Sequence, residues 1–164
     1  MAVAADDSKV FPATGLQDLL DALIADGYRV IGPTRDQGAI VLDEIDRVEA
    51  LPRGLRAVTD GGRYRLVDGG DGAWFAHTAG PDSLKRYLHP PRRRLFSVRR
   101  DGADLHLVPE AEPAPRFAFL GVRSCDLTAM RTLDRVLIED RFTDAGYRDR
   151  RAAALVIAVN CGEA

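Results

Sequence analysis

The chain has 164 residues, enough to build one hydrophobic core, and its hydrophobic fraction of 46% and charged fraction of 29% exclude a disordered polypeptide. The net charge of -2 argues against nucleic-acid binding or attraction to an anionic membrane. The longest apolar stretch, residues 152–159, is far shorter than the roughly 20 residues that cross a bilayer. The acidic amino terminus has none of the features of a secretory signal. We therefore expect no membrane insertion and a cytoplasmic location.

The amino-terminal half predicts one helix followed by short antiparallel strands. Residues 14–25 carry leucines at helical spacing, which predicts a helix that begins near Thr14. Apolar runs at 28–31 and 39–42 predict two strands, with turn signals at Gly32-Pro33 and at Gln37-Gly38 between them. Further along the chain, the sequence predicts a strand at 63–67, a helical turn at 82–87, and an antiparallel hairpin built from 95–98 and 105–108.

The carboxyl-terminal part has a different pattern. A proline-rich linker at 109–116 precedes an apolar strand at 117–121, a helix at about 125–138, a polar connection and a second apolar strand at 154–160. Nearly continuous apolar strands are typical of a parallel sheet covered on both faces. The sequence thus predicts an α/β or α+β fold, with an N-terminal helix and short antiparallel strands (1–108) packed beside a parallel βαβ unit (117–164).

The two cysteines are the main chemical candidates. Cys125 follows the first strand of the βαβ unit and Cys161 follows the second, so both thiols should emerge at one edge of the sheet, where open α/β folds bind ligands. A position at the start of a helix favours the thiolate form of Cys125, and Arg123 should act in the same direction. The alternative is that both cysteines are small apolar core residues, since free cysteine is commonly buried.

A family resemblance extends over most of the chain. It is carried by the segments GYRVIGPT (27–34), GAIVLDEID (38–46), LPRG (51–54), AGPDSLKRYLHPPRRRLF (79–96), FAFLGVRSCDLTAM (117–130) and IAVNCGE (157–163). Together these segments resemble the amino-terminal region of the dicluster ferredoxin-type beta subunits of hydrogenase, sulfhydrogenase and sulfur reductase.

The resemblance implies a non-catalytic electron-transfer component rather than a complete enzyme. In that family the region precedes a ferredoxin-like segment with two 4Fe-4S clusters, and catalytic and flavin-type subunits of a hydrogenase or reductase complex are the partners. Cys125 and Cys161 then become candidate ligands of an additional cluster. The sequence ends at Ala164 without further cysteines, so we expect an N-terminal fragment of a longer chain, with clusters in the full-length protein and none held by this fragment alone.

A basic segment, residues 85–100, is the second candidate site. Its cations include Lys85, Arg86, Arg92, Arg93 and Arg94, and they could dock an acidic redox partner or bind a nucleotide phosphate. The alternative is a solvated face with local ion pairs to acids such as Asp82 and Asp101.

Two other functions stay open. One is a thiol or nucleotide-dependent oxidoreductase that uses Cys125 as a nucleophile. The other is a protein-docking domain that acts through the basic segment. The three histidines show no metal-ligand spacing, so we expect them to be surface or core residues: His77, His89 and His106.

Overall fold

The computed structural model describes residues 12–78, 80–109 and 113–161. Its main element is a four-stranded sheet with the order β2-β1-β7-β8. The strands are β1 (Arg29–Asp36), β2 (Ala39–Glu44), β7 (Phe117–Val122) and β8 (Leu155–Ala158). β1 runs antiparallel to β2 and parallel to β7, and β7 runs parallel to β8. The mixed α/β architecture predicted from the sequence is therefore confirmed, and strands from both sides of the proline-rich segment share one sheet.

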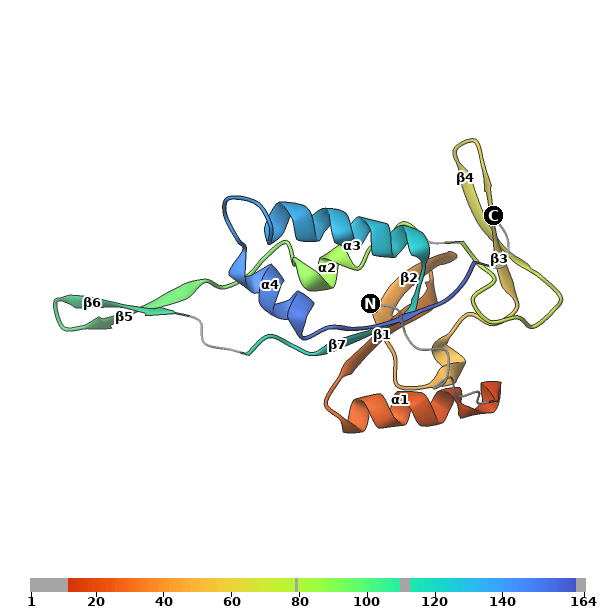
Figure 1. Cartoon of the computed structure of the whole chain (residues 1–164), viewed down its shortest axis with the longest axis horizontal. Helices are drawn as coiled ribbons and strands as arrows, with labels where there is room; N and C mark the ends of the chain where they lie inside the picture. The colour runs from red at the N-terminus through yellow and green to blue at the C-terminus, as the bar shows by residue number, and fades with distance from the viewer. Residues whose placement is uncertain (1–11, 79, 110–112, 162–164) are drawn as a thin grey trace.

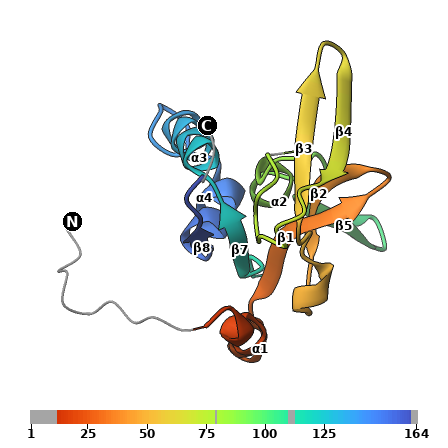
Figure 2. The same ribbon diagram turned by 90° about the vertical axis from the view of Figure 1, so that its right-hand side faces the viewer.

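Helices cover both faces of this sheet (Figure 1). On one face lies α1 (Leu16–Ala25), which follows the short 3-10 helix η1 (Ala13–Gly15). On the other face lie α2 (Lys85–Leu88), α3 (Ser124–Leu137) and α4 (Ala145–Ala152). Figure 2 shows α1 and α3 on opposite sides of the sheet. A second 3-10 helix, η2 (Val48–Ala50), follows β2.

Alternating side chains of β7 divide the core into two clusters. Phe117 and Phe119 pack with residues of α2, α3 and α4, whereas Ala118 and Leu120 pack with residues of α1. Strict alternation would place Val122 with the second cluster, yet it packs with the first. The reason is an irregularity in the pairing with β8 between Leu120 and Val122, because one extra residue reverses the alternation.

Two hairpins extend from the body of the molecule (Figures 1 and 2). One consists of β3 (Leu55–Asp60) and β4 (Arg63–Asp68), and the other of β5 (Phe96–Asp101) and β6 (Asp104–Pro109). Each forms a separate two-stranded antiparallel sheet. The β5–β6 hairpin confirms the sequence prediction, whereas β3 was not predicted.

Several local predictions were wrong. Gly32 and Pro33 lie inside β1 instead of forming a turn. Because β1 pairs with β7 only over Arg29 to Ile31, Pro33 needs no N–H donor on that side. The polar connection before β8 contains α4, a helix that was not predicted.

The βαβ unit also differs from expectation at its outer strand. β7 is buried along nearly its whole length, as predicted, but β8 is only partly covered. β8 is the last strand of the sheet order, so its apolar run does not mark burial on both faces. In the part of the chain that the structure describes, no helix combines the length and apolar character needed to cross a membrane.

Candidate functional site

Cys125 and Cys161 follow two neighbouring parallel strands at the same end. Val122, the last residue of β7, pairs with Ala158, the last residue of β8, and the Val159 N–H donates to the Val122 carbonyl over 2.8 Å. Each cysteine comes three residues after its strand ends, and both are exposed. The adjacency of the strands thus brings both cysteines to one edge, on the surface rather than in the core.

Arg123 occupies the junction between β7 and α3 and contacts three other parts of the chain. Its guanidinium donates to the carbonyl of Phe75 over 2.9 Å and also to the carbonyl of His77, and it lies 3.7 Å from Cys161 Sγ. Arg123 is the N-cap of α3, and its backbone N–H donates to the Asp126 carboxylate over 3.0 Å. The sequence led us to expect that this cation acts on Cys125, whereas in the structure its guanidinium contacts Cys161.

The loop that Arg123 holds has an unusual backbone. Phe75 is a non-glycine residue with a φ of 59°, a left-handed conformation that costs free energy. Its ring lies against Gly121 of β7, where an added Cβ would come within 2.8 Å of the ring. A glycine at this position leaves room for the ring, and the guanidinium of Arg123 fixes the two carbonyls of the same loop.

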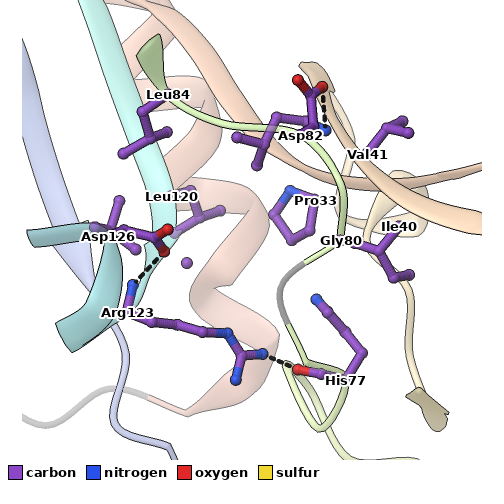
Figure 3. Close-up of a pocket in the computed structure, with 13 residues that line it drawn as sticks. Pro33, Ile40, Val41, His77, Gly80, Asp82, Leu84, Leu120, Arg123 and Asp126 are labelled. Atoms are coloured by element: carbon purple, nitrogen blue, oxygen red, sulfur yellow. Dashed lines mark hydrogen bonds between the residues drawn. The ribbon is translucent and has the colours of Figure 1, made fainter. Parts of the chain in front are cut away.

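A small pocket lies beside this junction (Figure 3). Its volume is about 40 Å³, room for a few water molecules at most. Polar residues line it at His77, Asp82, Arg123 and Asp126. Residues of β1, β2 and β7, together with Gly80 and Leu84, form the rest of the wall. The Asp82 carboxylate is already engaged, because it accepts hydrogen bonds from the Leu42 N–H and from Arg86.

His77 is the buried polar residue of this pocket. Its side chain is only 3% exposed, and its Nδ1 has no hydrogen-bond partner in the structure. Burial lowers the pKa of His77 to about 4, and the positive charge of Arg123 acts in the same direction. His77 is therefore neutral at pH 7 and lies in the core, one of the two placements expected for the histidines. By contrast, His106 is exposed on β6, and His89 Nε2 lies 3.7 Å from Asp144.

The candidate docking cations of the basic segment lie on two separate parts of the chain, α2 and the stretch before β5. Lys85 and Arg86 lie on α2, and Arg86 pairs with Asp82 over 2.6 Å. Arg93 lies 3.5 Å from Asp144, while Arg92 and Arg94 are exposed before β5. The pairing of Arg86 with Asp82 is the local ion pair that the alternative interpretation anticipated.

Both cysteines of the chain follow strands that end at this edge of the sheet. Thiolates are the ligands that iron–sulfur clusters use, so the residue type fits such a group. Across the described ranges, however, no group of three or more His, Cys, Asp or Glu side chains is placed to hold a metal ion. The two cysteines therefore fit part of a ligand set and do not complete one.

Comparison with known proteins adds one relative. The chain is 23% identical over 133 residues to the protein described as sulfhydrogenase 2 subunit beta from Pyrococcus furiosus. The chain resembles a sulfhydrogenase beta subunit. The match covers 81% of this chain but 31% of the relative, so the chain spans about a third of the relative's length. No family model matches the sequence, and no solved structure matches it.

The sequence did not indicate the contacts of Arg123 with the loop before α2. Phe75 and His77 lie 48 and 46 residues from Arg123 in the chain, and no motif links them. The positive charge next to Cys125 was visible in the sequence, but the direction of its side chain was not.

Proposed function

We propose that this chain is the amino-terminal module of an iron–sulfur electron-transfer subunit in a hydrogenase or sulfur reductase-type complex. The observation that carries the proposal is the pair of exposed thiols, Cys125 and Cys161, at the ends of adjacent parallel strands. The similarity to a sulfhydrogenase beta subunit over 81% of the chain supports it. In this proposal the chain does not perform the bond chemistry, and the clusters belong to the full-length protein.

The two cysteines would contribute part of a ligand set to a 4Fe-4S cluster, which supplies one-electron transfer when bound. A complete set needs about four ligands, so the others would come from a downstream ferredoxin-like segment of a longer polypeptide. Arg123 would assist by placing a positive charge 3.7 Å from Cys161 Sγ, since a nearby cation stabilises a thiolate. Its hydrogen bonds to two backbone carbonyls hold that charge in position.

Iron content of the longer polypeptide tests this proposal. Cys125→Ser and Cys161→Ser should each remove about four iron atoms and the matching acid-labile sulfide, the content of one 4Fe-4S cluster. Ser124→Ala is the matched control, because Ser124 is an exposed neighbour of Cys125 on the same helix. Iron and sulfide that stay unchanged in both cysteine variants would remove these residues from the ligand set.

A thiol-dependent oxidoreductase is a second candidate, favoured by one observation. Cys125 is exposed in the first turn of the 14-residue helix α3, where free backbone amides stabilise a thiolate. The two functions differ in their alkylation behaviour. A nucleophile at Cys125 reacts rapidly in the iron-free chain and much faster than Cys161, whereas cluster ligands are protected in the iron-loaded polypeptide and exposed together when iron is removed.

Docking of partner subunits is part of the same proposal. The partners would be the catalytic and flavin-type subunits of the complex, and Lys85, Arg86, Arg92, Arg93 and Arg94 are candidate contact residues. Charge reversal of Arg92 and Arg94 together, which lie exposed before β5, should weaken association most at low ionic strength. Association that is equally strong in the reversed variant would exclude these two residues from the contact.

A further inference from the structure

The β5–β6 hairpin is an isolated ribbon with an exposed surface on every residue. All six residues of β5 and all six of β6 are exposed. The two strands pair only with each other, and the hairpin projects from one end of the molecule (Figure 1). Two-stranded ribbons have marginal stability in water unless another element covers them. By contrast, the antiparallel pair β1 and β2 belongs to the four-stranded sheet, where β1 also pairs with β7.

The register of the hairpin separates an apolar face from a polar one. Residues directly opposite each other in an antiparallel pair lie on the same face. One face combines Phe96 with Pro109, Val98 with Leu107, and Arg100 with Leu105. The opposite face combines Ser97 with Val108, Arg99 with His106, and Asp101 with Asp104.

The first of these faces exposes large apolar side chains. Leu105 is 69% exposed, Leu107 68%, and Phe96 and Val98 54% each. Single exposed apolar residues are common on proteins, but four in two adjacent strands on one face form a continuous strip. We call this strip of Phe96, Val98, Leu105 and Leu107 the apolar strip. A long exposed apolar strand surface promotes association, so a partner for it is expected.

The charges around the apolar strip indicate what kind of partner fits. Residues 92–109 contain five arginines and two aspartates, whereas the whole chain has a net charge of -2. One of the arginines, Arg100, lies on the same face as the strip, and Arg92 and Arg94 are exposed at its base. A complementary surface is therefore apolar at its centre and carries carboxylates at its rim.

A second copy of the hairpin does not meet these requirements. Two hairpins stacked on each other would bring arginines of like charge together, which disfavours the contact. A face six residue pairs long is roughly 20 Å by 10 Å. It falls well below the roughly 800 Å² that each partner buries in a stable interface. A larger surface of a different protein can cover the strip and extend to the basic residues at its base.

We propose that the apolar strip of the β5–β6 hairpin is a docking surface for a different protein, whose contact region is apolar and rimmed by acidic side chains. The proposal does not depend on Cys125 or Cys161. The test of iron binding and the test of the docking surface can therefore give opposite results. It also places the main contact on the hairpin rather than on Lys85 and Arg86 of α2.

Site-specific photo-crosslinking in the cells from which the protein comes tests this proposal. The full-length polypeptide is made with p-benzoylphenylalanine on the apolar face (Phe96→p-benzoylphenylalanine or Leu107→p-benzoylphenylalanine). The matched controls carry the same probe on the opposite face (Ser97→p-benzoylphenylalanine or His106→p-benzoylphenylalanine). Because these positions are exposed on a ribbon outside the core, the probe should leave the fold unchanged, which circular dichroism checks.

The expected result is a crosslink to one different protein, several-fold stronger from positions 96 and 107 than from 97 and 106. Mass spectrometry of the crosslinked peptide should place it in a surface segment with aspartate or glutamate residues. Leu105→Glu combined with Leu107→Glu should abolish the crosslink from position 96. A crosslink to a second copy or to another segment of the same polypeptide would overturn the proposal. Crosslinks of equal strength from both faces, or no crosslink at all, would also overturn it.

Discussion

The guanidinium of Arg123 lies 3.7 Å from the sulfur of Cys161, at the edge where β7 and β8 end. The same guanidinium donates to the carbonyls of Phe75 and His77, so one side chain connects the loop before α2 to the second cysteine. Arg123 is therefore a direct structural link between this loop and the surroundings of Cys161.

Arg123→Ala should release the loop and destabilise the fold. Hydrogen bonds from a charged donor contribute about 1.5–3 kcal/mol each. Arg123 makes two of them to backbone carbonyls, and because one side chain makes both, their contributions are less than additive, so we expect a loss of about 2–4 kcal/mol. Urea unfolding measures this loss, and hydrogen exchange should show faster exchange over residues 73–78. Arg131→Ala is the control, because Arg131 is exposed on the same helix and its removal should change neither quantity. If residues 73–78 exchange as slowly in the Arg123 variant as in the parent protein, Arg123 does not hold this loop in place.

His77 should make the stability of the protein fall in mild acid. Burial lowers its pKa from 6.5 to about 4, so the unfolded chain binds a proton in this range while the folded chain does not. The stabilisation is fully present above about pH 6.5 and is lost as the pH falls toward 4, by on the order of 3 kcal/mol. Arg123 is the charged group that acts on this ring, and Asp82 and Asp126 line the same pocket.

Urea unfolding at a series of pH values checks this dependence. In His77→Leu the slope between pH 6.5 and 4 should become smaller, because the titrating group is gone. His106→Leu, which changes an exposed histidine on β6, should retain the full slope of the parent protein. Equal slopes in the parent and in His77→Leu would show that other groups cause the acid sensitivity.

The sequence was most informative where apolar residues follow a regular pattern. The apolar runs that became β7 and β8 predicted adjacent parallel strands, and this adjacency alone brings Cys125 and Cys161 to one edge. The segments 95–98 and 105–108, with an Asp101-Gly102 turn between them, likewise predicted the β5–β6 hairpin. In both cases several neighbouring residues, rather than one distant contact, determine the local structure.

The sequence was least informative where a single tertiary contact decides the structure. α4 has a polar sequence, AGYRDRR followed by Ala152, and only Tyr147 is buried, so no apolar periodicity reveals it. The cap formed by Asp144, which accepts from the Tyr147 N–H, was the available local signal. The contacts of Arg123 have no local signal, because they join residues that are far apart in the chain.

Tyr147→Phe should destabilise the packing of α4 on α3. The Tyr147 side chain is fully buried, and its hydroxyl donates to Asp134 over 2.6 Å. Removing the hydroxyl leaves this Asp134 oxygen without that donor, although Arg151 still contacts the carboxylate. We expect a loss of about 1–3 kcal/mol in urea unfolding.

Tyr147 should also make the stability of the protein fall at alkaline pH. Burial and the hydrogen bond to Asp134 raise the pKa of Tyr147 above its ordinary value of 10. The unfolded chain then loses its proton first, so the stability of the parent protein falls as the pH rises above about 10. In Tyr147→Phe this decline should be weaker, and Tyr64→Phe on β4 should leave it unchanged. A decline of the same size in Tyr147→Phe would assign the alkaline sensitivity to other groups.

Gly121→Ala should disturb the sheet edge through the ring of Phe75. Gly121 has a φ of 82°, and an added Cβ would lie 2.8 Å from the Phe75 ring, closer than side chains approach one another. Two costs therefore combine, the backbone strain of about 1 kcal/mol and the displacement of the ring. Gly62→Ala separates them, because Gly62 has a φ of 72° and nothing within 4 Å of its added Cβ. Urea unfolding should show a clearly larger loss for Gly121→Ala than for Gly62→Ala, with faster hydrogen exchange over residues 73–78 only in the former. Because Arg123 binds the carbonyls of the same loop, equal losses in the two variants would mean that Phe75 does not pack on Gly121.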